Sequence, residues 1–333
     1  MNYTNIVIES FQIVWKEKKL WVISALGTAF FALGNAIYTT GYLNWYQSML
    51  TKILTTMTSQ SQEAMPELSR MMPDYVEAIM TVWGMIFIVG YVVNLVARAG
   101  GIAEADRAWQ GEHVAVMRGL FTGVRKAPGM FLIDLIWALP GLVMGLVSMV
   151  LSFAILYSLF TSMMQMEGQE AGGHIGGLIG VFFLLIIAIM GLGLVYIIIR
   201  AIFAPLMFQS LVAGERSIGE AIREGWRLSR KNLKAMVIFW LLLFAIRLGM
   251  GMVIQLVVAP FFFMFITPMF RAMQAPDTLA SAINWPLLFL FGALMALVSW
   301  GTSSLLQSVT LALYARVYRE FVARETMALS LEA

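Results

Sequence analysis

Few residues in this chain could perform chemistry. There is no cysteine, and the two histidines, His113 and His174, lie far apart in separate polar segments. The missing cysteine excludes disulfides, thiolate metal sites and cysteine nucleophiles. Two distant histidines do not match a metal pair, and no HExxH, Walker or dinucleotide motif is present. We therefore expect no catalytic residue, no metal site and no cofactor, and predict that the protein is not an enzyme.

Ionisable residues inside apolar runs are a stronger indication of a specific role than the histidines are. Asp134, Arg200 and Arg247 lie in such runs, as does the polar Gln255. A charge at the centre of a membrane costs roughly 2.5–3.5 kcal/mol on insertion scales and needs a partner. Arg200 matches Asp134 best in depth, so we expect an ion pair, either as a packing contact or as part of a function.

Arg247 poses a separate question. It lies 13 residues after Lys234, about 20 Å along a helix, near or past the middle of the bilayer. Gln255, backbone carbonyls, a lipid phosphate, a water-filled cavity or a partner subunit could stabilise its charge. Structural and functional roles are both open for this residue.

These side chains must be positioned by membrane helices. Apolar residues make up 60% of the chain and charged residues only 12%, whereas soluble domains carry about 25% charged residues. Runs of roughly 20 apolar residues can cross the hydrocarbon core. We predict an all-α, polytopic membrane protein, a single transmembrane domain over residues 1–333, with six spans at about 20–42, 79–103, 130–163, 177–212, 235–270 and 285–315.

The basic residues indicate an orientation. Most of the 22 lysines and arginines lie before the first span, between the second and third, between the fourth and fifth, or after the last. The positive-inside rule then places both termini in the cytoplasm of a bacterial cytoplasmic (inner) membrane. The first 15 residues lack the basic cluster of a signal peptide, so we expect the first span to be retained. Because the charge lies at membrane boundaries, we expect no nucleic-acid partner.

A basic amphipathic helix leads into the fifth span. Ser217 and Glu220 have the spacing of a capping box, and the following residues alternate between an apolar and a basic face. Such a helix can lie in the lipid headgroup layer, or it can be an ordinary connector packed on the bundle. The candidate contacts for anionic lipid headgroups or a partner are Trp15, Lys18, Lys19, Arg125, Lys126, Trp226, Arg227, Arg230 and Lys231.

The chain carries a weak internal repeat. A shift of 105 residues aligns Arg118 with Arg223 and Arg125–Lys126 with Arg230–Lys231. Three hairpin units, at about 1–105, 106–213 and 214–324, would account for six spans. On the opposite side of the membrane, the segment 42–78 is predicted to form two short helices along the membrane surface.

Methionine and glycine have structural interpretations here. The 25 methionines could in principle bind Cu(I), but adaptable apolar packing is the favoured explanation. Gly141 and Gly145 form a GxxxG pattern, for which we expect packing inside the chain rather than dimerisation.

One segment resembles a known family. The string Ile-Gly-Glu-Ala-Ile-Arg-Glu-Gly-Trp-Arg-Leu-Ser-Arg-Lys-Asn-Leu at Ile218 to Leu233 is similar to the cytoplasmic segment of a broad group of bacterial six-span membrane proteins. That group is related to the membrane domain of glycerophosphoryl diester phosphodiesterases. The resemblance implies a six-span architecture. In those enzymes the chemistry resides in a separate soluble barrel, which we expect this chain to lack, so no catalytic residue is carried over.

Three functional hypotheses follow. The first is a non-enzymatic scaffold or accessory subunit that packs against other membrane-protein subunits, or against copies of itself, and interacts with lipid. The second is a small transporter or permease component whose pathway is lined by Asp134, Arg200 and Arg247. The third is a membrane-embedded enzyme acting on lipid, for which the acidic residues Glu104, Asp106 and Glu112 are the candidates.

Overall fold

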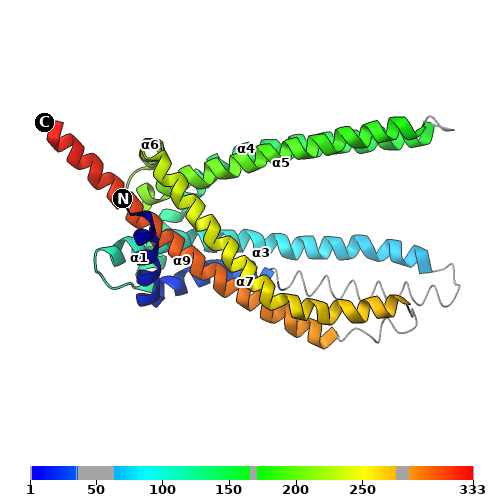
Figure 1. Cartoon of the computed structure of the whole chain (residues 1–333), viewed down its shortest axis with the longest axis horizontal. Coiled ribbons are helices and arrows are strands. Elements are labelled where there is room, and N and C mark those ends of the chain that lie inside the picture. The colour runs from blue at the N-terminus through cyan, green and yellow to red at the C-terminus, as the bar shows by residue number, and fades with distance from the viewer. Residues whose placement is uncertain (1, 35, 37–63, 166–170, 275–284, 333) are drawn as a thin grey trace. The chain divides into compact units, whose positions relative to one another are not determined.

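The described part of the chain is almost entirely helical. The computed structural model describes residues 2–34, 36, 64–165, 171–274 and 285–332, and these ranges contain helices and no strand (Figure 1). The predicted all-α class is therefore confirmed. The helices are α1 (Tyr3–Lys16), α3 (Ala64–Trp109), α4 (Val116–Gln165), α5 (Ala171–Val212), α6 (Ile218–Lys231), α7 (Leu233–Gln274) and α9 (Trp285–Glu332). Residues 18–34 form a further helix.

Within the described ranges, five helices are long and apolar enough to cross a membrane. Their candidate spans are Gly84–Trp109, Val116–Ala154, Phe182–Val212, Leu233–Leu256 and Leu290–Ala328. They overlap five of the six predicted spans, as expected for a multi-pass membrane protein. The remaining prediction, at 20–42, lies within the described residues only at 20–34 and 36, and these are helical.

The boundaries of several elements differ from the prediction. Residues 64–78 of the predicted surface segment belong to α3 and continue into its span, whereas residues 42–63 lie outside the described residues. α5 begins at Ala171, about six residues before the predicted start of the fourth span at about 177. α4 runs unbroken through Pro128 and Pro140, since neighbouring groups can satisfy the backbone that a proline frees in a membrane helix.

The contacts divide the chain into two units. Unit 1 comprises Met1–Ala127 and Leu241–Arg319, and unit 2 comprises Pro128–Trp240 and Glu320–Ala333. The core of unit 1 includes Val14, Ile23 and Ala97 together with side chains of α9. The chain therefore brings its N-terminal helices and α9 together although almost 300 residues separate them.

In unit 1, α3 and the beginning of α4 touch backbone to backbone. A Cβ atom added at Gly100 would collide with the carbonyl of Gly119, and one added at Gly119 would lie 2.8 Å from the side chain of Glu104. Only glycine permits this approach. The crossing places the first turns of α4 directly beside the charged residues near the end of α3.

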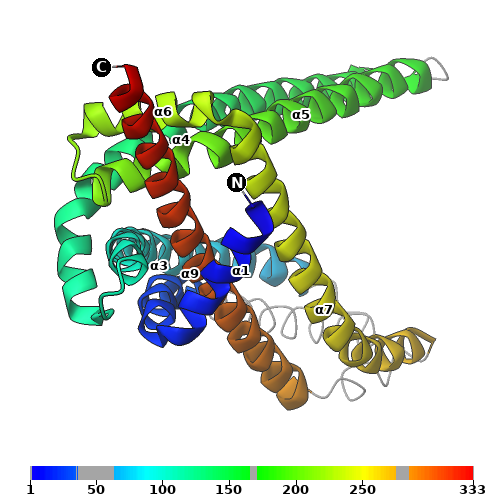
Figure 2. The ribbon, with the colours of Figure 1, turned by 60° about the vertical axis from the view of Figure 1, so that its left-hand side comes forward.

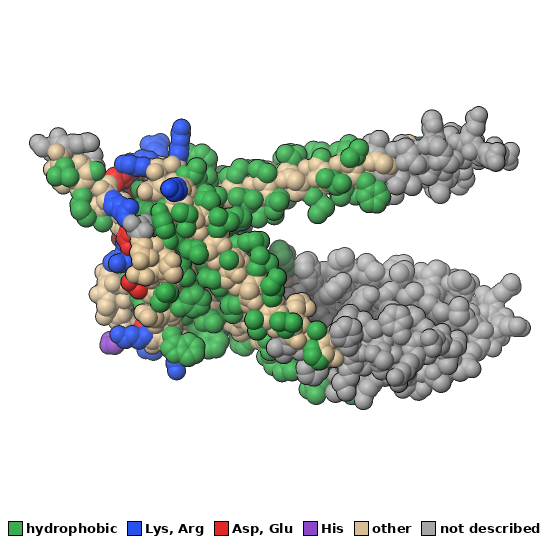
Figure 3. All heavy atoms as spheres, in the orientation of Figure 1, with side chains coloured by type: hydrophobic (Ala, Val, Ile, Leu, Met, Phe, Trp, Pro, Cys, Tyr) green, Lys and Arg blue, Asp and Glu red, His purple; other side chains and the backbone are tan. Residues whose placement is uncertain are grey.

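In unit 2, α4 and α5 run side by side (Figures 1 and 2). Their described side chains are mostly apolar and exposed, as at Leu142, Val143 and Leu184 (Figure 3). An apolar exposed surface of this kind is expected where a helix faces lipid. The amphipathic helix α6 packs against α5, and the contact is close because Gly225 lies against the backbone of Met207.

Candidate functional site

A buried carboxylate joins the end of α3 to the beginning of α4 in unit 1. Glu104 is fully buried, and its carboxylate accepts hydrogen bonds from Arg107 at 2.7 Å, from the backbone N–H of Ala115 at 2.8 Å, and from two nitrogens of Arg118 at 2.8 and 2.9 Å. The bonds from Arg118 and Ala115 join the end of α3 to the beginning of α4 and the turn before it. Arg107 and Arg118 offset the negative charge of Glu104, and both of its oxygens accept hydrogen bonds. Glu104 is therefore a structural ion-pair centre rather than a free acid or base.

A second set of contacts ties α3 to α9. Both oxygens of Asp106 accept hydrogen bonds from Arg319. The indole N–H of Trp109 donates to the carbonyl of Ala312 at 2.8 Å, and the guanidinium of Arg316 lies over the Trp109 ring at 5.0 Å from its centroid. These polar contacts surround the apolar core at one end of unit 1, which we call the charged end.

The three acids considered for lipid chemistry therefore have different surroundings. Glu104 and Asp106 are engaged by arginines, whereas Glu112 is half exposed and lies 3.8 Å from Arg118. His113 is exposed and lies 3.8 Å from Glu17. Among the described residues, no three His, Asp or Glu side chains are grouped as a metal site would require.

The predicted ion pair between Asp134 and Arg200 is present in unit 2. Asp134 is buried, and one of its oxygens accepts a hydrogen bond from Arg200 at 2.8 Å. Arg200 itself is 39% exposed. Nearby, the indole of Trp137 donates to the sulfur of Met207 at 3.3 Å. The pair links α4 to α5 across their apolar surfaces.

Arg247 lies elsewhere, on the part of α7 that belongs to unit 1. It is exposed and lies close enough to Tyr314 of α9 for a Coulombic interaction. Tyr314 precedes Arg316, whose side chain packs on Trp109 at the charged end. Gln255 is also exposed and follows Arg247 by about 12 Å along the helix.

The basic residues of α6 divide into paired and unpaired ones. Arg227 and Lys231 both contact Glu325 of α9, at 2.9 and 3.6 Å. Arg230 is exposed, and no ion pair to it exists within the described residues. Trp226 is 45% exposed and stacks on Phe203 of α5, with ring centroids 4.4 Å apart. α6 is thus packed on the bundle along one face and keeps exposed basic and aromatic side chains on another.

The start of α6 is fixed by the predicted capping box. The carboxylate of Glu220 accepts hydrogen bonds from the backbone N–H and the hydroxyl of Ser217, at 3.1 and 2.8 Å. These bonds hold the pKa of Glu220 below its ordinary value of 4.5. The ionised form of Glu220 is therefore the one that stabilises the helix start.

The remaining predicted contacts lie in unit 1. Trp15, Lys18, Lys19 and Arg125 are exposed, Trp15 by 73%, and Lys126 is half-buried. In the described part of the chain, no carboxylate forms an ion pair with Lys18, Lys19 or Arg125.

Sequence reasoning missed the partners of Glu104 and Asp106. The available signal was the high share of small residues at 97–105, where six of nine are alanine or glycine. Small residues allow close helix packing, so a charge among them is expected to be buried. Comparison of the chain with protein-family models, with curated proteins and with solved structures finds no match.

Proposed function

We propose that this protein is a non-enzymatic scaffold or accessory subunit of a bacterial inner-membrane complex, which also holds anionic lipid headgroups at the cytoplasmic face. One observation carries the proposal. The two buried carboxylates of the described residues, Glu104 and Asp134, are both paired with arginines, whereas several exposed cations have no such pair. The exposed lysines and arginines that form no ion pair with a carboxylate therefore give the surface a positive charge.

The pairing of the acids argues against lipid chemistry. A general acid or base needs a proton that it can exchange with substrate, and Glu104 is enclosed by Arg107, Arg118 and the Ala115 amide. Its bonds hold α3 and α4 together instead. A protein whose buried charges serve its own packing is suited to holding partners in place.

The unpaired cations suit an anionic lipid surface. Each Lys or Arg near such a surface contributes about 1 kcal/mol of attraction. Arg230 on α6 and Arg125 near the start of α4 are exposed, and each lies within four residues of an exposed aromatic side chain, Trp226 or Phe121. Aromatic side chains beside basic ones are typical of the membrane–water interface.

We further propose six spans in three hairpin units, with both termini in the cytoplasm, as in the six-span group that residues 218–233 resemble. Two similarities support the repeat. α1 ends at Lys16 just before the helix of residues 18–34, and α6 ends at Lys231 just before α7. In addition, the beginning of α4 and the middle of α6 each cross a preceding helix at a glycine, Gly119 or Gly225.

The lipid part of the proposal is tested by quantifying bound lipid. The protein is purified in mild detergent, incubated with an equimolar mixture of phosphatidylglycerol and phosphatidylcholine, and analysed by native mass spectrometry. We expect the wild type to retain phosphatidylglycerol preferentially and Arg125→Gln with Arg230→Gln to reduce that preference. Arg324→Gln is the control, because Arg324 is also exposed but pairs with Glu320. Equal retention by the double variant and the control would contradict the lipid role.

The scaffold part is tested by chemical crosslinking in native membranes followed by gentle purification. A stoichiometric protein partner, or a defined oligomer of this chain, is the expected result. A protein that remains alone under both conditions would overturn the scaffold assignment.

A transporter remains the alternative because Arg247 is an exposed cation within the candidate span Leu233–Leu256. The variant Arg247→Leu separates the two proposals. Loss of solute flux into proteoliposomes, with normal folding and normal partner binding, would favour the permease. Loss of partner binding would favour the scaffold.

A further inference from the structure

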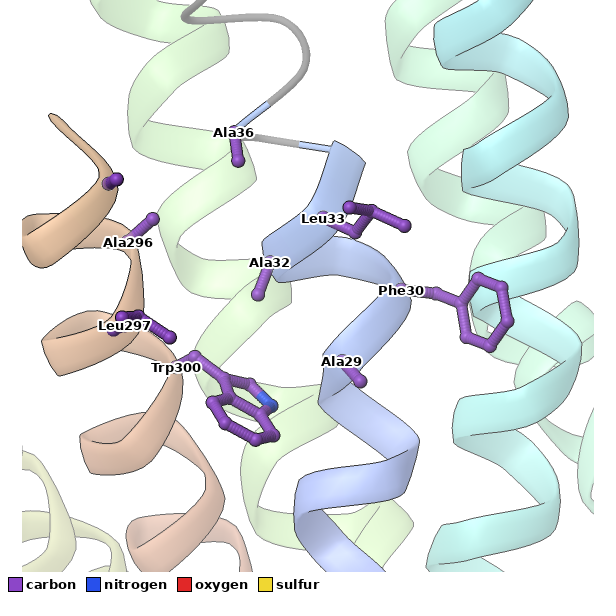
Figure 4. Close-up of a pocket in the computed structure, with 9 residues that line it drawn as sticks. Ala29, Phe30, Ala32, Leu33, Ala36, Ala296, Leu297 and Trp300 are labelled. Atoms are coloured by element: carbon purple, nitrogen blue, oxygen red, sulfur yellow. The ribbon is translucent and has the colours of Figure 1, made fainter. Parts of the chain in front are cut away.

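A groove in unit 1 lies between the helix of residues 18–34 and α9, which are hydrogen-bonded to each other on the side of the groove nearer the charged end. The indole of Trp300 on α9 donates to the carbonyl of Ala25 at 3.0 Å, and the hydroxyls of Thr28 and Ser304 lie 2.7 Å apart. Beyond these bonds the helix of residues 18–34, together with Ala36, and α9 line a groove of about 540 Å³ (Figure 4).

Small apolar side chains form this groove. Five of its nine lining residues are alanines, Ala29, Ala32, Ala36, Ala293 and Ala296, and Trp300 closes the end nearest the joined region. Figure 4 shows Leu297 and Trp300 pointing from α9 toward the helix of residues 18–34. The groove leaves room because alanine does not fill the space between two helices that larger side chains would fill.

The same helix leads from the groove to an unpaired cation. At 100° per residue, Lys18, Val22, Ala29 and Leu33 fall on one face. Lys18, Val22 and Leu33 are exposed, and the indole rings of Trp15 and Trp21 lie on either side of Lys18 in the sequence, both exposed. No carboxylate of the described chain pairs with Lys18. A strip along this face, exposed at Lys18, Val22 and Leu33 and half-buried at Ala29, therefore leads from a basic, aromatic-flanked position to the apolar groove.

We propose that this strip and groove bind one anionic phospholipid, with its phosphate at Lys18 and Lys19 and the end of one acyl chain in the part of the groove near Ala29. Residue 29 lies about 16 Å from residue 18 along the helix. A lipid leaflet, half of a bilayer of about 40–45 Å, is deep enough for a chain end to reach it. This inference rests on the proposed function, since it takes exposed basic residues as headgroup contacts.

The headgroup must provide the selectivity. Lipid tails are as apolar as the groove, so moving a tail from bilayer to groove gains little hydrophobic free energy. The charge of Lys18 and Lys19 favours a headgroup with a net negative charge over a zwitterionic headgroup, whose own cation offsets its phosphate. The groove then determines where the tail lies, and the lysines determine which lipid is bound.

Photo-labelling of the full-length protein tests both halves of the site. The protein is reconstituted into phosphatidylcholine vesicles that contain a trace of phosphatidylglycerol with a diazirine either near the headgroup or at the tail end. Labelled peptides are mapped by mass spectrometry. We expect headgroup-proximal probe on residues 21–26 and tail-end probe on residues 29–33 and 297–300, each in excess over the exposed lipid-facing peptide 142–146.

Two variants then isolate the contributions. Lys18→Gln should reduce labelling of the groove by the anionic probe about five-fold, the effect of one interfacial cation, without changing labelling by a phosphatidylcholine probe. Lys234→Gln is the matched control, because Lys234 is also exposed, follows a break between two helices and has no ion pair within the described residues. Ala29→Phe should remove tail-end labelling at 297–300 and leave headgroup-proximal labelling at 21–26.

Three results would overturn the proposal. They are equal labelling of the groove by anionic and zwitterionic probes, labelling no greater than on 142–146, and an unchanged pattern in Ala29→Phe. Lys18→Gln changes an exposed residue and keeps the test valid if Ala29→Phe does not fold. Because Arg125 and Arg230 test the proposed function separately, a failure at this groove is distinguishable from a failure of lipid binding as a whole.

Discussion

The ion-pair centre at Glu104 gives the most stringent prediction. Replacing Glu104 by glutamine keeps the shape but removes the charge, and the amide has one acceptor oxygen where the carboxylate has two. Four hydrogen bonds converge on this carboxylate. The amide nitrogen would face guanidinium or backbone donors and could not accept the bonds that they now make.

The cost follows from the geometry. A hydrogen bond to a charged group is worth about 1.5–3 kcal/mol, and breaking a buried ion pair costs about 3–5 kcal/mol. The arginines are only partly buried, with Arg118 41% and Arg107 32% exposed, so water can replace part of their interaction. We therefore expect a loss of about 3 kcal/mol in the free energy of unfolding. At about 2 °C per kcal/mol for a chain of this size, the melting temperature falls by about 6 °C.

Thermal unfolding in detergent, followed by tryptophan fluorescence, measures this shift. Glu112→Gln is the control, because Glu112 is a half-exposed carboxylate at 3.8 Å from the same Arg118, and exposed pairs contribute about 0–1 kcal/mol. If Glu104→Gln melts at the same temperature as Glu112→Gln, the buried carboxylate does not hold α3 and α4 together and the reasoning is refuted.

Three further predictions use the same assay. Gly225→Ala places a Cβ atom 2.6 Å from a neighbouring backbone and should destabilise the protein by about 1–3 kcal/mol, whereas at Gly219, where nothing lies within 4 Å, alanine should be neutral or stabilising. Glu220→Gln should lower the melting temperature at pH 7. Because the pKa of Glu220 is held below its ordinary value of 4.5, the difference between the variant and the wild type should be complete above pH 4.5 and should vanish as the pH falls through the lowered pKa. Asp134→Ala should lower the free energy of unfolding by about 3 kcal/mol, whereas replacing both Asp134 and Arg200 with leucine should leave it nearly unchanged. A double variant no more stable than the single variant would show that the pair is more than a packing contact.

The sequence by itself determined the helices and their class. Long apolar runs in a membrane must satisfy their own backbone hydrogen bonds, and a helix does this within one segment. The same local logic predicted the capping box at Ser217 and Glu220, which depends on a spacing of three residues. Depth along two helices was enough to match Asp134 with Arg200.

Tertiary structure alone decided which partners the other groups have. The bonds from Arg118 to Glu104 depend on a crossing at Gly100 and Gly119, and nothing local in the sequence distinguishes this crossing from other glycine contacts. The groove between Ala29 and Ala296 joins residues more than 260 positions apart. Helix periodicity shows which side chains share a face of one helix, but the neighbour that each face meets is set by the packing of the whole bundle, because side chains of many helices compete for the same contacts.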